Sequence, residues 1–376
     1  MRLIFKILVI AFLATLPLLG FASIVEGLYS TTIEVPDQSR AQREKGFSLA
    51  LAQVLIKTTG AKDISSRRGV NDALSQASNY MVKYAYLPRL EHEKTEGDQL
   101  PAKSGIPLSV QFAKATIDDL MRKLDLPIWP ANRPELLIWV LEQTTSGYRF
   151  VEGSDLPREL QHSFQRRGLP IQLPLYDLQD QLALKPVDAW SLNQQKLIDA
   201  AKRYGADHWL VLRYSKISNG AVRGSWHLAA RSGNFAREGA VLNTLQVESK
   251  GAYLQGSADQ VVDLFAGKMA YFADADTDLF RLVVENIGSF SAYSQLNDFL
   301  GRLQIVNGVK VRSIDGDTIV LDLATEGESR VLLRALNKEP RLSRITQLGD
   351  DSPEQALAVA ARHSGSVEHY RWQAAR

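Results

Sequence analysis

The amino-acid sequence predicts a multi-domain protein of mixed α+β and α/β class. Its 376 residues are about two to three times the length of a typical domain, so several hydrophobic cores are expected. Capped, amphipathic helical patterns alternate along the chain with β-rich segments, which is typical of mixed folds. A composition of 45% hydrophobic and 23% charged residues excludes a long disordered chain, a collagen or a coiled coil.

Residues 1–22 have the pattern of a secretory signal peptide. Arg2 and Lys6 precede an apolar run that ends at Leu19, and Ala22 is the small residue expected directly before a cleavage site. The run is too short to cross a bilayer, which needs about 20 helical residues. We therefore expect export to a bacterial periplasm, with cleavage after Ala22. The alternative is an inner-membrane protein that is anchored by an uncleaved N-terminal segment.

The first predicted domain, residues 23–130, is a compact α+β unit. Ser39 and Gln42 form a capping box at the start of an amphipathic helix, and Gly60 is the residue that ends it. Residues 25–35 before this helix have the composition of a strand. The other elements expected here are a helix at 70–81, strands at 80–87 and 106–112, and a helix at 115–124.

The second predicted domain, residues 131–275, follows a proline-rich stretch at 126–134. Residues 136–141 form a continuous apolar run, which is typical of a central strand buried on both faces. Ser191 and Gln194 form a second capping box, opening a helix closed by Gly205. Further elements are a helix at 157–166 capped by Asp155, strands at 169–175, 208–214, 221–231 and 240–248, and a helix at 257–272. The β-α-β-α-β order predicts a three-layer α/β domain.

The third predicted domain, residues 276–348, has the element order β-α-β-β-α-β of the ferredoxin-like split motif. Asp315 and Gly316 form a strong tight-turn signal between its two middle strands. The expected strands are 279–284, 304–314, 318–323 and 342–348, and the expected helices are 293–303 and 327–336. Residues 349–376 read as a polar C-terminal tail, with one alternating segment at 367–372.

Motifs of known enzymes and metal sites are missing from the sequence. The absence of cysteine excludes disulfides, a thiolate nucleophile and a cysteine-ligated metal. No G-x-S-x-G, H-E-x-x-H or glycine-rich phosphate loop is present. Asp274, Asp276 and Asp278 resemble the start of a calcium loop, but Leu279 stands where that loop needs glycine. The sequence thus predicts no catalytic residue, no cofactor and no metal site.

Several short motifs resemble a known family. They are Tyr29-x-x-x-Ile33-x-Val35, the run Thr58-Thr59-Gly60 at a helix end, and Leu126-Pro127-x-Trp129. This pattern is similar to the exported proteobacterial family called domain of unknown function 2066, and it implies export without implying any activity. The turn Tyr204-Gly205-Ala206-Asp207 before a strand resembles α/β domains of periplasmic assembly factors, which bind partner proteins.

These observations predict a periplasmic, non-enzymatic accessory protein that binds other envelope proteins in an assembly or adaptor role. With 44 basic and 42 acidic residues, no nucleic-acid partner is expected. Membrane contact is expected only through an uncleaved N-terminal helix. The alternatives are a peptidoglycan-binding or small-ligand-binding protein and an enzyme with an unrecognised site.

Structural features can separate these alternatives. An exposed apolar patch or an unpaired sheet edge would favour a protein partner. Two tryptophans in one exposed groove would favour a glycan, and a large pocket with converging ionisable groups would favour an enzyme. The segments expected to contact a partner are the charged loop at 91–104 and an exposed strand at 367–372.

Overall fold

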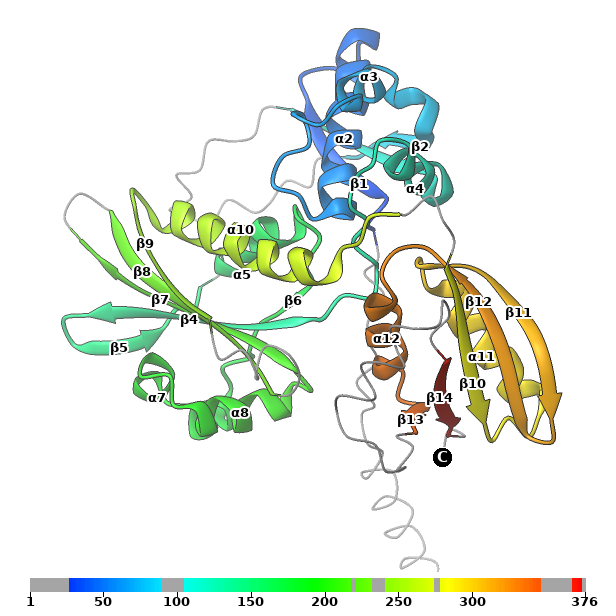
Figure 1. Cartoon of the computed structure of the whole chain (residues 1–376). Helices are drawn as coiled ribbons and strands as arrows, with labels where there is room; N and C mark the ends of the chain where they lie inside the picture. Colours follow the sequence, from blue (N-terminus) through cyan, green and yellow to red (C-terminus); the bar gives the residue numbers. More distant parts are fainter. Residues whose placement is uncertain are drawn as a thin grey trace, which may run out of the picture.

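The computed structural model describes residues 27–88, 105–153, 155–217, 221–231, 241–273, 278–345 and 367–373. Three sheets follow one another along the chain, each with its own helices (Figure 1), so the predicted mixed class is confirmed. The predicted signal peptide, the loop at 91–104 and residues Asp274 and Asp276 lie outside the described residues. No helix in the described ranges is long and apolar enough to cross a membrane.

The N-terminal unit is a three-stranded antiparallel sheet in the order β1-β3-β2 with helix α2 packed on it. As predicted, α2 starts after Ser39, whose side chain accepts the Gln42 N–H, and it ends at Gly60 with a left-handed φ of 70°. The helix expected at 70–81 is instead divided between α3 and a 3-10 turn, η1. The bounds are β1 (Ser30–Val35), α2 (Arg40–Thr59), α3 (Val70–Ser75), η1 (Ala77–Tyr80), β2 (Met81–Tyr86), β3 (Ile106–Phe112) and α4 (Lys114–Lys123).

The middle unit has three layers, as predicted. Its strands are β4 (Leu136–Thr144), β5 (Gly147–Phe150), β6 (Ile171–Gln172), β7 (His208–Lys216), β8 (Val222–Ala230) and β9 (Val241–Val247). Helices α5 (Leu156–Gln165) and α10 (Lys250–Met269) cover one face, and α7 (Pro186–Trp190) and α8 (Gln194–Arg203) cover the other (Figure 1). Ile138 of β4 enters the first core and Trp139 enters the second, which confirms the strand buried on both faces.

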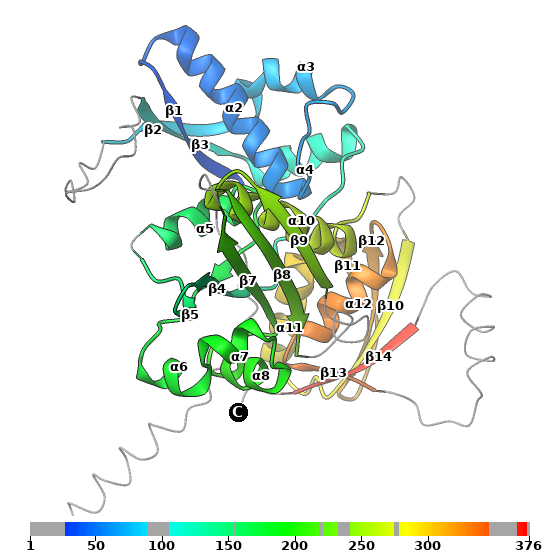
Figure 2. The same ribbon diagram turned by 90° about the vertical axis from the view of Figure 1, so that its left-hand side faces the viewer.

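The start of α8 differs from the prediction. Its N-cap is Asn193, whose side chain accepts the Lys196 N–H, while Ser191 lies at the end of the unpredicted helix α7. A left-handed residue, Leu192 with φ 59°, turns the chain between the two helices, so Ser191 lies two residues too early to cap α8. A second unpredicted helix, α6 (Leu178–Ala183), lies on the same side of the sheet (Figure 2).

The C-terminal unit contains the predicted β-α-β-β-α-β order with one additional strand. Its elements are β10 (Asp278–Glu285), α11 (Phe290–Arg302), β11 (Val306–Asp315), β12 (Thr318–Thr325), α12 (Ser329–Lys338), β13 (Leu342–Arg344) and β14 (Val367–Trp372). The sheet order is β11-β12-β10-β14-β13, so β14 is inserted between the first and last strands of the motif.

The exposed strand predicted at 367–372 is therefore wrong. β14 pairs in parallel with β10 and antiparallel with β13, so both of its edges are occupied. Its alternating pattern directs Tyr370 and Trp372 into the core, where they are 0% and 2% exposed. This segment belongs to the C-terminal sheet and is not a free partner-contacting strand of a polar tail.

The N-terminal and middle units meet at Gly60 and Trp129. The Trp129 N–H donates to the Thr58 carbonyl at 2.8 Å, and the buried Arg167 guanidinium donates to the Gly60 carbonyl. Arg167 also forms an ion pair with Asp259 of α10 at 3.0 Å. Motif residues of the family resemblance thus lie where two units are fastened together.

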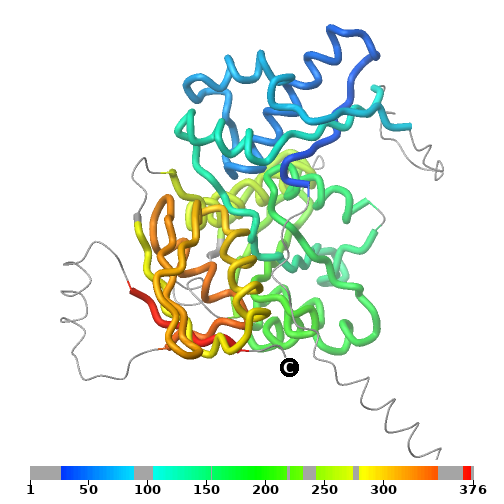
Figure 3. Tube along the Cα trace, turned by 90° about the vertical axis from the view of Figure 1, so that its right-hand side faces the viewer, coloured from blue at the N-terminus to red at the C-terminus, as the bar shows by residue number. Residues whose placement is uncertain are grey.

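The N-terminal and C-terminal units share one continuous hydrophobic core, and an ion pair with a buried carboxylate joins them. Arg122 of α4 donates twice to the Glu326 carboxylate, at 2.8 Å each, and the Tyr271 hydroxyl donates to the same carboxylate at 3.1 Å. We call Gly60, Arg122, Trp129, Arg167 and Glu326 the joint. Figure 3 shows the N-terminal unit seated on the other two units.

Candidate partner-binding surface

Helix α6 exposes its apolar side chains to solvent. None of its residues is buried, and Leu178 and Leu182 are 71% and 74% exposed. They occupy positions i and i+4 and therefore share one face of the helix. Leu175, just before the helix, is 72% exposed. Single exposed leucines are common, but three lie within this short segment, and we call Leu175, Leu178 and Leu182 the leucine surface.

A set of polar contacts, the clamp, anchors this segment to α8. The Arg203 guanidinium donates to both carboxylate oxygens of Asp177 at 2.6 Å and to Asp180 at 2.5 Å. The Tyr204 hydroxyl donates to Asp180 at 2.5 Å and accepts the Leu175 N–H at 2.9 Å. A helix of six residues is not stable by itself in water, so these contacts hold α6 in place.

The local sequence explains the start of α6. Asp177 has extended backbone angles and its side chain accepts the Asp180 N–H at 3.0 Å, as an N-cap residue does. Asp180 also accepts the N–H of Tyr176, a residue with a left-handed φ of 54°. Two carboxylates therefore fix the turn that leads from Leu175 into the helix.

The electrostatics of the clamp favour its charged form. The hydrogen bond from Arg203, followed by the Asp180 N–H, lowers the pKa of Asp177 to about 2. Burial, reinforced by the hydrogen bond to Asp180, raises the pKa of Tyr204 to about 12. The carboxylate, the guanidinium and the neutral phenol are therefore the forms present at neutral pH. Each is in the protonation state that the hydrogen bonds of the clamp require.

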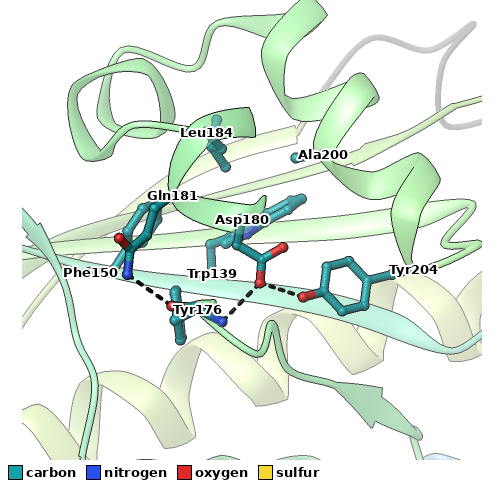
Figure 4. A pocket seen from close by; sticks show the side chains of 8 residues that line it. All are labelled: Trp139, Phe150, Tyr176, Asp180, Gln181, Leu184, Ala200 and Tyr204. Carbon is teal, nitrogen blue, oxygen red and sulfur yellow. Dashed lines mark hydrogen bonds between the residues drawn. The ribbon is translucent and has the colours of Figure 1, made fainter. Parts of the chain in front are cut away.

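A small hollow lies beneath α6, on the α8 side of the sheet (Figure 4). It is lined by Trp139, Phe150, Tyr176, Asp180, Gln181, Leu184, Ala200 and Tyr204, and it has room for about one water molecule. Asp180 is its one carboxylate, and Arg203, Tyr204 and the Tyr176 N–H already occupy it. The hollow therefore supports the position of α6 and lacks the size of a substrate pocket.

Two further possibilities raised by the sequence are a metal site and a glycan-binding groove. Within the described ranges, no group of three or more His, Cys, Asp or Glu side chains is arranged to hold a metal ion. All six tryptophans are described. Five of them are buried, each at most 3% exposed, while Trp190 is partly exposed and stacks on Tyr148 with the ring centroids 4.5 Å apart. No two tryptophans share an exposed groove, so the feature that would favour glycan binding is missing.

The sequence reasoning missed the leucine surface. Of the two segments expected to contact a partner, the loop at 91–104 lies outside the described residues and the strand at 367–372 is internal. The available signal was Asp177 as an N-cap followed by Leu178 and Leu182 at helical spacing. It was weak because the helix has only six residues and buries none of them.

Comparison with protein families gives one match. Residues 22–130 match a family described as a domain of unknown function, DUF8605, over a span close to the predicted N-terminal domain at 23–130. The resemblance to domain of unknown function 2066 stays a prediction. No curated protein matches the chain.

Solved structures give distant likenesses. The C-terminal domain of LpoB from Salmonella enterica has 19% identity, covers 30% of this chain and 82% of its own, and has a TM-score of 0.21. TolB from Acinetobacter baumannii has 13% identity, 43% and 34% coverage and a TM-score of 0.24. Lipoprotein GNA1162 from Neisseria meningitidis has 12% identity, 36% and 99% coverage and a TM-score of 0.22. Likenesses at these scores carry no inference about fold or function.

Proposed function

We propose that this chain is a non-enzymatic accessory protein of the bacterial cell envelope that binds a protein partner through the leucine surface. One observation carries the proposal: Leu175, Leu178 and Leu182 face solvent on a segment that polar contacts fix in place. Burying a leucine side chain contributes about 1.5–3 kcal/mol. A partner that covers these side chains gains this free energy, which the isolated chain leaves unused.

The clamp makes the surface suited to binding. Ordering a flexible segment on association costs free energy, and a segment that is already ordered avoids much of this cost. Arg203 and Tyr204, at the end of α8, hold the backbone that precedes α6 and the first turn of α6. The leucines are therefore presented on a rigid support.

The non-enzymatic part of the proposal is supported by the size and pairing of the hollow under α6. It accommodates about one water molecule, and its carboxylate, Asp180, is already bound by three donors. General acid–base catalysis would need a titratable group within reach of a bound substrate. The envelope address is supported by the N-terminal sequence, with Arg2 and Lys6 ahead of an apolar run.

Site-specific photo-crosslinking in intact cells tests the proposal. A photoreactive residue is placed at Leu178 or Leu182 of the full chain, and at Phe290 as the matched control. Phe290 is 81% exposed but lies on α11 of the C-terminal unit. We expect one discrete protein adduct, the same from positions 178 and 182, and no such adduct from position 290.

The clamp provides a second arm of this experiment. Replacing Arg203 by Gln should reduce the adduct from position 178, because α6 loses its main anchor. Identical adducts from all three positions, or none from 178 and 182 while the protein is correctly exported and folded, would contradict a role for the leucine surface.

A further inference from the structure

The outer edge of strand β2 has free main-chain hydrogen-bonding groups. The Leu87 N–H donates to the Pro107 carbonyl at 2.9 Å, and β2 pairs with β3 in antiparallel register. In such a ladder alternate residues face the partner strand, so Ala85 faces β3 as Leu87 does. The N–H and C=O groups of Tyr84 and Tyr86 then point away from β3. Among the described residues, no strand pairs with this edge.

Apolar side chains extend along the same edge. Tyr84 and Tyr86 project to the α2 side of the sheet, where Phe47 of α2 contacts the Tyr84 ring at a centroid distance of 5.1 Å. The Tyr84 and Tyr86 rings lie 6.2 Å apart in an edge-on arrangement. Tyr84 is nevertheless 42% exposed and Val82 is 59% exposed. Helix α2 thus covers this row only in part, and one more strand would complete the cover.

The edge is also positively charged. The Arg43 guanidinium lies 5.8 Å from the centre of the Tyr84 ring on the α2 side. Lys83 is exposed and projects from the opposite side of β2, because neighbouring residues of a strand alternate in direction. Neither cation forms an ion pair with an acidic residue in the described part of the chain. Within the described residues, each side of the edge therefore offers a cation without a carboxylate partner.

Other edges in the molecule differ from this one. β11 is the outer strand of the C-terminal sheet, and two register shifts and the charged residues Lys310 and Arg312 interrupt it. β2 has a single register shift, between Met81 and Lys83, and is regular from Lys83 to Tyr86. Bulges and charges are the usual protection against an added strand. On β1, the opposite edge of the N-terminal sheet, the exposed residues include Thr32 and Glu34, which are polar. The β2 edge combines free main-chain groups, exposed aromatic surface and unpaired cations.

We infer that the β2 edge binds an extended, acidic segment of a partner protein, which adds to the N-terminal sheet as a fourth strand. Main-chain hydrogen bonds to Tyr84 and Tyr86 hold the segment, as in other cases of strand addition. Its apolar side chains lie beside the two tyrosines on the α2 side, and its carboxylates, on the opposite side of the added strand, meet Lys83. This site is separate from the leucine surface, so either can fail without the other.

Peptide binding to the full mature chain tests the inference. The probe is a fluorescent peptide of alternating valine and glutamate, and the comparison probes are its valine–lysine counterpart and a version with alternate backbone amides methylated. We expect saturable binding of the first probe, weakened by salt, and binding at least about tenfold weaker for each of the other two. Equal binding of all three peptides, or no binding of the first, would overturn the inference.

Paired variants locate the binding edge. Tyr84→Pro removes an outward N–H, which an edge strand tolerates, whereas Tyr84→Val retains it. Thr32→Pro makes the same change on the opposite edge of the sheet, where the register leaves Thr32 facing outward. We expect Tyr84→Pro to bind about tenfold more weakly than Tyr84→Val and Thr32→Pro to bind like the unmodified chain. If Thr32→Pro weakens binding as much, or if Tyr84→Pro dissociates a dimer of the purified chain, the inference is wrong.

Discussion

Two arginine–carboxylate contacts fasten different parts of this molecule. In the joint, Arg122 reaches across two units to Glu326, whose side chain is only 4% exposed. In the clamp, Arg203 holds Asp177, whose side chain is 44% exposed, within one unit. The Glu326 carboxylate is covered by protein, although Arg122 is 32% exposed, and this pair joins two units that share one hydrophobic core. In the clamp Arg203 is 23% and Asp180 12% exposed, and the pair holds a helix that has no buried residue.

The two contacts are expected to have different roles: the joint stabilises the fold, and the clamp presents the leucine surface. Removing one partner of a buried pair leaves an uncompensated charge and costs several kcal/mol, whereas exposed pairs contribute about 0–1 kcal/mol. The joint is therefore where substitutions should lower the free energy of unfolding most. The clamp is where substitutions should leave it folded while altering the leucine surface.

The largest expected difference in the free energy of unfolding is between substitutions at two glycines that have left-handed φ angles. A Cβ at Gly60, φ 70°, would lie 2.6 Å from the Trp129 ring and 2.7 Å from the Ala266 Cβ, whereas Gly205, φ 63°, has nothing within 4 Å. We expect Gly60→Ala to lower the free energy of unfolding by about 3 kcal/mol, from backbone strain and overpacking together. Gly205→Ala should cost about 1 kcal/mol. Urea denaturation of both variants measures the difference, and equal losses would show that the Gly60 contact with Trp129 is not tight in solution.

The buried ion pair should respond to both substitution and pH. Burial raises the pKa of Glu326, but hydrogen bonds from Arg122 and Asn307 and the charge of Arg122 outweigh it and leave the pKa below its ordinary range. The stabilisation is thus present above the unfolded value of about 4.3 and is lost as pH falls through the folded pKa. Arg122→Met should cost about 2–3 kcal/mol at pH 7.

The pH dependence distinguishes this loss from a packing defect. Without Arg122, burial dominates and Glu326 takes up a proton more readily, so the deficit of Arg122→Met should be smaller at pH 4 than at pH 7. Arg312→Met is the control, because Arg312 is 55% exposed and pairs with Asp322 at the surface. Its effect should stay within about 0.5 kcal/mol. A deficit for Arg122→Met that is the same at pH 7 and pH 4 would argue against the charge pair as its source.

Local sequence signals predicted much of the fold. The Ser39 cap and the Gly60 terminus of α2 depend on residues next to each other in the chain, and the apolar run of β4 reflects burial on both faces. β14 escaped prediction because its place depends on β10, from which more than eighty intervening residues separate it, as the pairing of Arg281 with Val367 shows. No local sequence pattern indicates this long-range strand pairing.

The candidate site was harder to predict for a related reason. Sequence patterns reveal helices through a buried apolar stripe, and α6 has none. Its stability depends on Arg203 and Tyr204, which lie at the end of α8 and reach back to Asp177 and Asp180. The leucines look like core residues in the sequence, and only the structure shows that they face solvent.

Leucines of the α6 segment should divide into two classes by their effect on stability. Leu184 is 2% exposed and lies in the core beneath α6, so Leu184→Ala should cost about 2–4 kcal/mol. Leu178 and Leu182 are exposed, so the double change to serine should alter the free energy of unfolding by no more than about 0.5 kcal/mol. Chemical denaturation measures both values. A large loss for the double serine variant would mean that the leucines pack against this chain itself.

The smallest expected effect is on the titration of Asp177. Arg203 is the main cause of its low pKa, about 2, so Arg203→Gln should move the pKa toward the ordinary value of about 3.9. Because the folded pKa is depressed, the clamp should persist above about pH 3.9 and be lost as pH falls through 2 in the unmodified chain. Carboxyl NMR titration measures this shift. Asp199, held chiefly by Lys202, should titrate unchanged in the variant and serves as the internal control. If Asp177 already titrates near its ordinary value in the unmodified chain, Arg203 does not hold it in solution, and α6 lacks the anchor that would present its leucines.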